Sequence, residues 1–171
     1  MKKITVISLL AAAFLFASCS TAGYLRPAIS QQLYKQQVPG DAVVIFNLAK
    51  VVLPAVGYSV LSSDSKSKYI STKPMQITID SSDCDCGTAM GLPIIRSKPV
   101  KADVTFNIGV ASNELTISAD ITPDLSDGGL GVLLAGANVM CVSKGKLEET
   151  LAKSMVNSMK DKLKIKLPFG F

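Results

Sequence analysis

Two late segments of the chain alternate strictly between apolar and polar residues, and they constrain the fold more than any other feature. Positions 102, 104, 106, 108 and 110 are apolar in the first, and positions 115, 117, 119 and 121 in the second. Side chains along a strand point to opposite faces, so a period of two predicts strands with one buried face. The Ala-Ser-Asn-Glu turn between them predicts an antiparallel hairpin whose other face meets water.

Shorter strand signals come earlier, at Tyr58–Ser63 and Tyr69–Asp80, with a polar Asp-Ser-Lys-Ser-Lys turn between them. This pattern predicts a second hairpin. Pro74 interrupts the second segment and cannot donate to a ladder, so we expect it at an edge or a bulge.

A first helix is predicted directly after Asp41, a residue type that caps helices, with Gly57 at its C-terminal end. The segment is apolar almost all round. Either it is buried on two sides, which we expect, or it offers its second face to a lipid or a partner. The face expected to pack on the sheet comprises Val44, Leu48, Val51, Val52 and Ala55.

A second helix is predicted near the C-terminus, with Ser143 as its cap and an apolar stripe at Leu147, Leu151, Met155, Met159 and Leu163. Helix, hairpins and helix together predict one α+β domain over residues 42–171, with an antiparallel sheet and both helices packed on one face. Residues 19–41 are polar and contain two prolines, which predicts a tether. The glycine-rich stretch 128–136 predicts a loop.

The N-terminus has the pattern of an export signal: Lys2 and Lys3, an apolar run to Phe16, then Ala17 and Ser18 before Cys19. The run is shorter than the roughly 20 residues of a spanning helix. It resembles the lipobox signal of bacterial lipoproteins, with Phe16 where that family usually has leucine. The resemblance implies removal of residues 1–18 and lipidation of Cys19. Ser20 resembles the residue that follows the lipidated cysteine in outer-membrane lipoproteins, which implies the periplasmic face of that membrane.

The chain has three cysteines in addition to Cys19, and an exported chain can form disulfides. Cys84 and Cys86 are too close in sequence to bridge each other comfortably. We therefore expect one bond from Cys141 to Cys86 or to Cys84, with Cys86 preferred because Gly87 lets the backbone turn. In the chain-entropy account such a bond stabilises by roughly 4 kcal/mol. The remaining thiol would be free or would pair between molecules.

Cys84 and Cys86 could hold a soft metal through two thiolates, with Cys141 as a third ligand, but we expect neither a metal nor a cofactor. Structural zinc sites use four ligands and commonly C-x-x-C spacing, and neither is present. The C-x-x-C motif of thioredoxin-like redox proteins is also missing from the sequence.

The chain has no histidine, which removes the usual nucleophile–base pairs and the commonest general base. We therefore expect no enzymatic activity. Carboxylates and Ser–Lys pairs can still catalyse hydrolysis, so the conceivable catalysts are Asp83, Asp85, Asp120, and Ser143 with Lys146.

A basic, partly aromatic segment closes the chain and could contact a membrane or a partner. The alternative is a solvated helix end whose lysines the helix dipole favours. The formal net charge of +5 is too modest to indicate nucleic-acid binding. The residues of this segment are Lys160, Lys162, Lys164, Lys166, Phe169 and Phe171.

The apolar helix, the Gly-Tyr-Ser-Val-Leu-Ser-Ser step that follows it and the closing helix resemble the helix-and-sheet domains of outer-membrane accessory lipoproteins, including those of the β-barrel assembly machine. The resemblance covers about residues 42–79 and 145–163 as a pattern. It implies a membrane-anchored, non-enzymatic binding or assembly module that is held by its lipid and has another envelope protein as its expected partner. The alternatives are a carrier of an apolar ligand, with the first helix and the Gly-Leu loop as cavity walls, and a hydrolase or redox enzyme.

Overall fold

The computed structural model describes residues 23–96, 98–126, 134 and 138–165. It is a mixed α+β fold, as predicted, with an open antiparallel sheet and two helices. The elements are β1 (Tyr24–Leu25), β2 (Tyr34–Gln37), α2 (Ala42–Ala55), β3 (Val60–Asp64), β4 (Tyr69–Thr72), β5 (Met75–Ile79), β6 (Cys84–Asp85), β7 (Thr88–Ala89), β8 (Leu92–Pro93), β9 (Val100–Ala111), β10 (Glu114–Pro123), β11 (Cys141–Ser143) and α4 (Lys146–Ile165).

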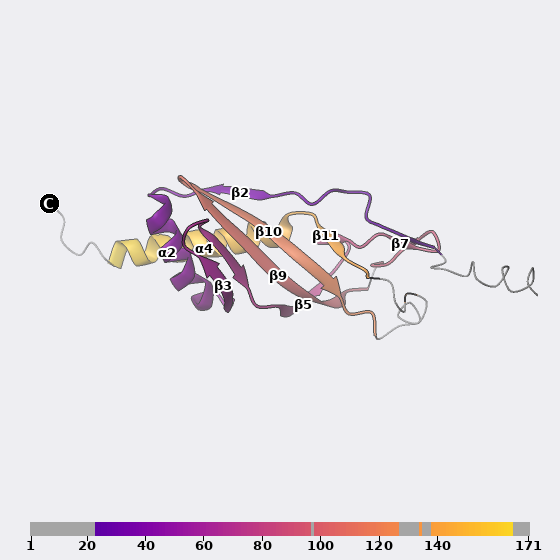
Figure 1. The fold of residues 1–171 in the computed structure, drawn as a ribbon. Coiled ribbons are helices and arrows are strands. Elements are labelled where there is room, and N and C mark those ends of the chain that lie inside the picture. The colour runs from indigo at the N-terminus through magenta and orange to yellow at the C-terminus, as the bar shows by residue number, and fades with distance from the viewer. Residues whose placement is uncertain (1–22, 97, 127–133, 135–137, 166–171) are drawn as a thin grey trace, which may run out of the picture.

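The predicted long hairpin is confirmed as β9 and β10, the two longest strands in Figure 1. Its alternating apolar residues are buried on one face, whereas the other face carries partly exposed polar side chains. Ser112 takes a positive φ of 52° in the tight turn between the strands. The central register is Phe106 opposite Ala119.

Each outer edge of this hairpin is shared by two short strands laid end to end. Along β9, β4 pairs with residues 107–109 and β5 with residues 100–104. Along β10, β2 pairs with residues 114–117 and β11 with residues 120–121. The strands β3 and β6 extend the sheet further, at β4 and β11 respectively.

Buried side chains close the two gaps that this arrangement leaves. The Phe106 N–H, between β4 and β5, donates to Thr72 Oγ1 at 2.9 Å. The Ala119 N–H, between β2 and β11, donates to Glu148 Oε1 at 3.1 Å, and its carbonyl accepts from Gln31 Nε2 at 3.0 Å. Buried backbone groups need such partners, so Thr72 and Glu148 complete the ladder where no strand reaches.

The second predicted hairpin is confirmed as β3 and β4, which pair antiparallel with a register shift between Val60 and Ser62. The predicted strand Tyr69–Asp80 is divided into β4 and β5. Pro74 lies between the two, where it interrupts no ladder.

The segment predicted as a tether is partly built into the fold. Strand β1 pairs with β7 in a small sheet that also contains β8, and β2 pairs along β10. Val38 is buried in the core. The folded unit therefore begins before the predicted boundary at residue 42, because a strand of polar residues can gain its hydrogen bonds from the edge of β10.

Helix α2 begins and ends where the sequence predicts. Asp41 accepts from the Val43 N–H at 2.7 Å, and Gly57 adopts a φ of +95° after the last turn. The predicted buried face was wrong in part: Val52 is buried and Leu48 partly buried, but Val44, Val51 and Ala55 are exposed. A helix that is apolar all round permits two packing faces, and the one bearing the larger side chains is buried: Ile45, Phe46, Ala49, Val52 and Leu53.

Helix α4 buries the predicted stripe at Leu151, Met155 and Met159, with Leu147 partly buried. The Ser143 hydroxyl lies just before the helix, where it accepts from the Gly145 N–H and donates to the Glu148 carboxylate. Leu163 and the glycine-rich loop, apart from the buried Leu134, lie outside the residues whose side chains are described. Neither helix in the described part of the chain has the length and hydrophobicity to cross a membrane.

The helices and the buried sheet face enclose one hydrophobic cluster. Helix α4 contacts β10, β2 and α2, and α2 contacts β9 and β3. In Figure 1 the molecule is elongated: α2 and the last turns of α4 lie at one end, and β7 of the small sheet lies at the other.

We predict that Thr72→Val lowers the free energy of unfolding by about 1–3 kcal/mol, because the buried Phe106 N–H loses its acceptor while the side-chain volume hardly changes. Thr72→Ser retains the hydroxyl and should cost less than Thr72→Val. Urea unfolding of both variants checks this. Equal losses, or a neutral Thr72→Val, would show that the hydrogen bond is unimportant.

Candidate functional site

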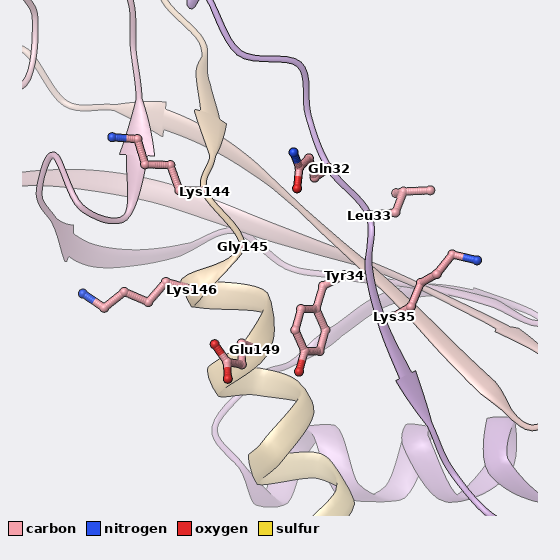
Figure 2. Close-up of a pocket in the computed structure, with 8 residues that line it drawn as sticks. All are labelled: Gln32, Leu33, Tyr34, Lys35, Lys144, Gly145, Lys146 and Glu149. Atoms are coloured by element: carbon pink, nitrogen blue, oxygen red, sulfur yellow. The ribbon is translucent and has the colours of Figure 1, made fainter.

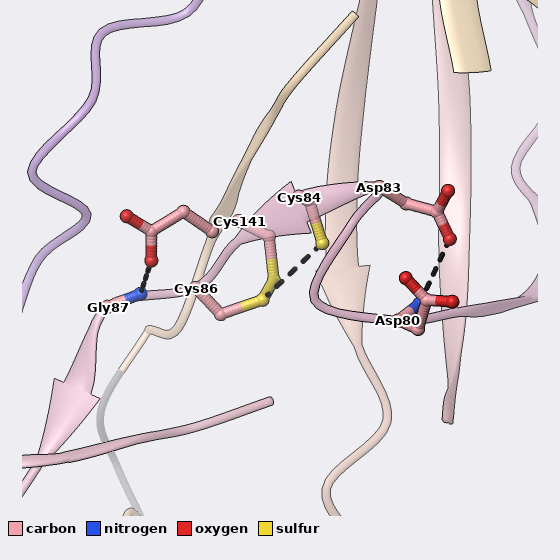
Figure 3. Close-up of a disulfide and its surroundings, with 7 residues drawn as sticks. Asp80, Asp83, Cys84, Cys86, Gly87 and Cys141 are labelled. Atoms are coloured by element: carbon pink, nitrogen blue, oxygen red, sulfur yellow. Dashed lines mark hydrogen bonds between the residues drawn. A yellow bond between two sulfur atoms is a disulfide. The ribbon is translucent and has the colours of Figure 1, made fainter. Parts of the chain in front are cut away.

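The three described cysteines meet where β6 pairs with β11. The antiparallel register places Cys84 opposite Ser143 and Asp85 opposite Val142. Cys86 and Cys141 continue this register and are joined in a disulfide across 55 positions of sequence, as Figure 3 shows. This bond is compatible with the pairing preferred from the sequence.

Cys84 is the remaining free cysteine of the described residues, and its side chain is 1% exposed. Its Sγ lies 3.8 Å from Cys86 Sγ. Burial, together with the charge of Asp83, raises the pKa of Cys84 from 9.0 to about 12. The predicted alternative of pairing between molecules does not fit this position, because another chain could not reach the sulfur.

A tight turn ahead of β6 positions the cluster. The Asp80 N–H donates to Asp83 Oδ2 at 3.0 Å (Figure 3). The Ser82 N–H donates to Asp80 Oδ1 at 2.6 Å. Hydrogen bonds from Ser82 hold the pKa of Asp80 below its usual value. Asp83 also forms an ion pair of 2.9 Å with Lys146, which raises the lysine pKa and fastens the turn to the start of α4.

Gly87 turns the chain away after the disulfide. Its φ is +79°, and a Cβ there would collide with the Leu25 carbonyl oxygen. The Gly87 N–H donates to Asp85 Oδ1 at 2.8 Å. Only glycine adopts this positive φ without strain and also leaves room for the Leu25 carbonyl oxygen. Gly87 therefore allows the N-terminal arm to lie against the cysteine cluster.

A surface cavity of about 510 Å³ lies beside the cluster, with Cys84 and Cys86 among its lining residues. Two cationic residues, Arg96 and Lys144, also line it, together with the carboxylate residue Asp85. Both cysteines are nevertheless almost fully shielded from solvent, at 1% and 2% exposed. Sequence reasoning missed Arg96 and Lys144 as neighbours of the cysteines, because nothing in their local sequence indicates this contact.

A second cavity, of about 340 Å³, lies between the N-terminal arm and the start of α4 (Figure 2). The Tyr34 ring points toward Glu149 across it. Three lysines line it, but each amino group already has an acceptor: Lys35 contacts Glu114, Lys144 the Ser81 carbonyl, and Lys146 Asp83.

Of the conceivable catalysts, the structure brings Lys146 to Asp83 and not to Ser143. The Ser143 hydroxyl donates to buried Glu148 at 2.6 Å, whereas Lys146 is paired with Asp83. Asp120 accepts from Asn107 on the open face of the sheet, and Asp85 accepts from Gly87. Each group therefore has a structural partner of its own.

The outward face of α2 is a second candidate site, for binding. Val43, Val44 and Val51 are 50%, 53% and 56% exposed. Lys50 lies on the same helix with its ammonium 5.6 Å from the centre of the Phe46 ring. We refer to Val43, Val44, Lys50 and Val51 as the α2 outer face.

The predicted lipidation and tail sites are only partly described. Lys160 and Lys162 are exposed near the end of α4. The Lys164 side chain lies outside the described part of the chain, as do Cys19, Lys166, Phe169 and Phe171.

No protein-family model matches the chain, and no curated protein sequence matches it either.

We predict that the free energy of unfolding falls as the pH rises from 9 towards 12, partly because of Cys84. Its folded-state pKa is about 12 against an ordinary 9.0, so the unfolded chain releases the proton first. In Cys84→Ala this contribution is lost and the decline should be shallower. Urea unfolding of the oxidised chain across this range measures both slopes, and parallel slopes would contradict the burial of this thiol.

Proposed function

We propose that the protein is a lipid-anchored, non-enzymatic binding module of the bacterial envelope, and that its α2 outer face docks an apolar, acid-flanked segment of another envelope protein. The observation that carries the proposal is the exposure of the valines at positions 43, 44 and 51, each half or more exposed on a helix whose other face is fully packed.

The position of these valines on α2 favours binding. Val44 and Val51 are seven residues apart and so lie on one side of the helix, whereas Val43 lies about 100° further round, in line with the exposed Asn47 and Lys50. A surface helix normally places polar residues on the side that faces water. Grouped apolar side chains on such a surface are typical of a contact with a partner.

The charges around this face favour an acidic partner. Lys50 is the sole charged residue of α2. The exposed Lys160 and Lys162 lie toward the end of α4, which packs beside α2 (Figure 1). A segment that buries its apolar side chains on the valines and places carboxylates at the rim would complement these lysines, with a contact that weakens in salt.

The direction of the lipid anchor favours a protein over the anchoring membrane. Lipidated Cys19 would precede Tyr24 by five residues, a reach of at most about 18 Å. Strand β1, which contains Tyr24, belongs to the small sheet with β7, at the end of the molecule opposite α2 (Figure 1). The α2 outer face would then point away from that membrane. The resemblance to accessory lipoproteins of the outer membrane supports the same assignment.

Site-specific photocrosslinking tests the proposal. A crosslinking residue replaces Val44 or Val51 in the lipidated chain in living cells, and intact mass spectrometry checks the lipid on Cys19. We expect both positions to crosslink to one and the same envelope protein. Leu92 is a matched control, because it is 50% exposed and belongs to the small sheet. It should not capture that protein.

A second variant tests whether the crosslink depends on the apolar character and the charge of the α2 outer face. Val44→Glu brings a negative charge to the surface that an acidic segment would meet, and should reduce the crosslink from position 51 at least tenfold while leaving the melting temperature almost unchanged. Crosslinks to lipid alone, to many unrelated proteins, or equally from position 92 would refute the docking surface.

A further inference from the structure

The three sulfurs at the β6–β11 pair form a compact cluster. The Sγ atoms of Cys84, Cys86 and Cys141 all lie within 4.8 Å of one another, and all three residues are buried. From the sequence, motif spacing and the number of ligands weighed against a metal held by Cys84, Cys86 and Cys141. The structure brings the sulfurs of these three residues together, as the predicted disulfide requires.

The spacing of the sulfurs is close to that of a thiolate site. Zinc–sulfur bonds are about 2.3 Å long, so three sulfurs arranged around one ion stand about 4 Å apart. Cys84 Sγ and Cys86 Sγ are already 3.8 Å apart. Once the disulfide is reduced, side-chain rotation at Cys86 or Cys141 can bring that pair to the same separation.

We propose that reduction of the Cys86–Cys141 disulfide creates a binding site for one soft d¹⁰ cation, such as Zn²⁺, Cd²⁺ or Cu⁺, held by the thiolates of Cys84, Cys86 and Cys141. Thiolate ligands select cations of this class. The site is separate from the α2 outer face and does not depend on docking there.

The chemistry balances with a dithiol as the reductant. The dithiol supplies two electrons and two protons and becomes a disulfide, while the Cys86–Cys141 bond opens into two thiols. The cation then forms three bonds to sulfur and displaces one proton from each thiol. In the oxidised protein two of the three ligands are consumed by the disulfide, so the redox state controls binding.

The surroundings suit such a site. Paired strands hold the cysteines, and the Asp83–Lys146 ion pair fastens the preceding turn. Three thiolates and a divalent ion leave one negative charge. Lys144 favours this negative charge, with Arg96 beside it in the adjacent cavity, whereas the carboxylates of Asp83 and Asp85 oppose it. The same cavity lies next to Cys84 and Cys86.

The test uses the full chain with Cys19→Ser, so that this residue cannot compete for the ion. One sample is oxidised, and the other is reduced with a dithiol that is then removed without oxygen. Both are titrated with Cd²⁺, followed by native mass spectrometry and by ultraviolet thiolate-to-cadmium absorption. We expect one tightly bound ion in the reduced chain and none in the oxidised chain.

Cys84→Ser is the decisive variant, because it keeps the disulfide pair and removes one ligand. Loss of an outer-shell partner alone costs about 10–100-fold in metal affinity, so loss of a direct ligand should weaken Cd²⁺ binding at least tenfold. Circular dichroism reports whether each reduced sample stays folded, and Cys86→Ser/Cys141→Ser provides a folded-state comparison without the bond. Equal affinity in reduced Cys84→Ser, or equal binding by the oxidised chain, would overturn the proposal.

Discussion

The arrangement of the sheet depends on two buried hydrogen bonds at its centre, from Thr72 to the Phe106 N–H and from Glu148 to the Ala119 N–H. Phe106 and Ala119 face each other across the β9–β10 hairpin. On their outer sides, Phe106 and Ala119 have no strand partner, because the short strands along each edge of the hairpin end before they reach these two residues. An unpaired buried N–H is costly, so a side chain must take the place of the missing strand.

The Glu148 contact also positions both candidate sites. Its carboxylate contacts β10 through Ala119 and β11 through Ser143, and so fixes the first turn of α4 against the sheet. Strand β11 then supports β6 and the cysteine cluster. The other end of α4 packs beside α2, whose larger side chains are buried and whose valines are left in solvent. One buried acid therefore links the sulfur cluster to the helix layer that supports the proposed docking face.

Sequence periodicity was sufficient to predict the elements whose buried face is set by an alternation of apolar and polar residues. The β9–β10 hairpin and the α4 stripe followed from periods of 2 and 3.6, and the α2 boundaries from Asp41 and Gly57. Periodicity could not identify the buried face of α2, because both faces are apolar.

Strand β2 was missed for the opposite reason. Its residues Tyr34–Gln37 are mostly polar, and they form a strand because they pair with the edge of β10. Nothing in the sequence singled out Thr72 or Glu148, since only the tertiary gaps give them partners. The approach of Cys141 to Cys84 and Cys86 was expected from the number and spacing of the cysteines, whereas the β6–β11 pairing that produces it was not.

Amide hydrogen exchange at Phe106 and Ala119, resolved by nuclear magnetic resonance, tests the central claim most directly. Both amides lie beside strand ends, where an unpartnered N–H would exchange quickly. If Thr72 and Glu148 close the ladder, both should be protected as strongly as the strand-paired amides of Ile108 and Ile121. Exchange at the rate of an open loop at either position would show that the corresponding gap is not closed and would contradict this account of the fold.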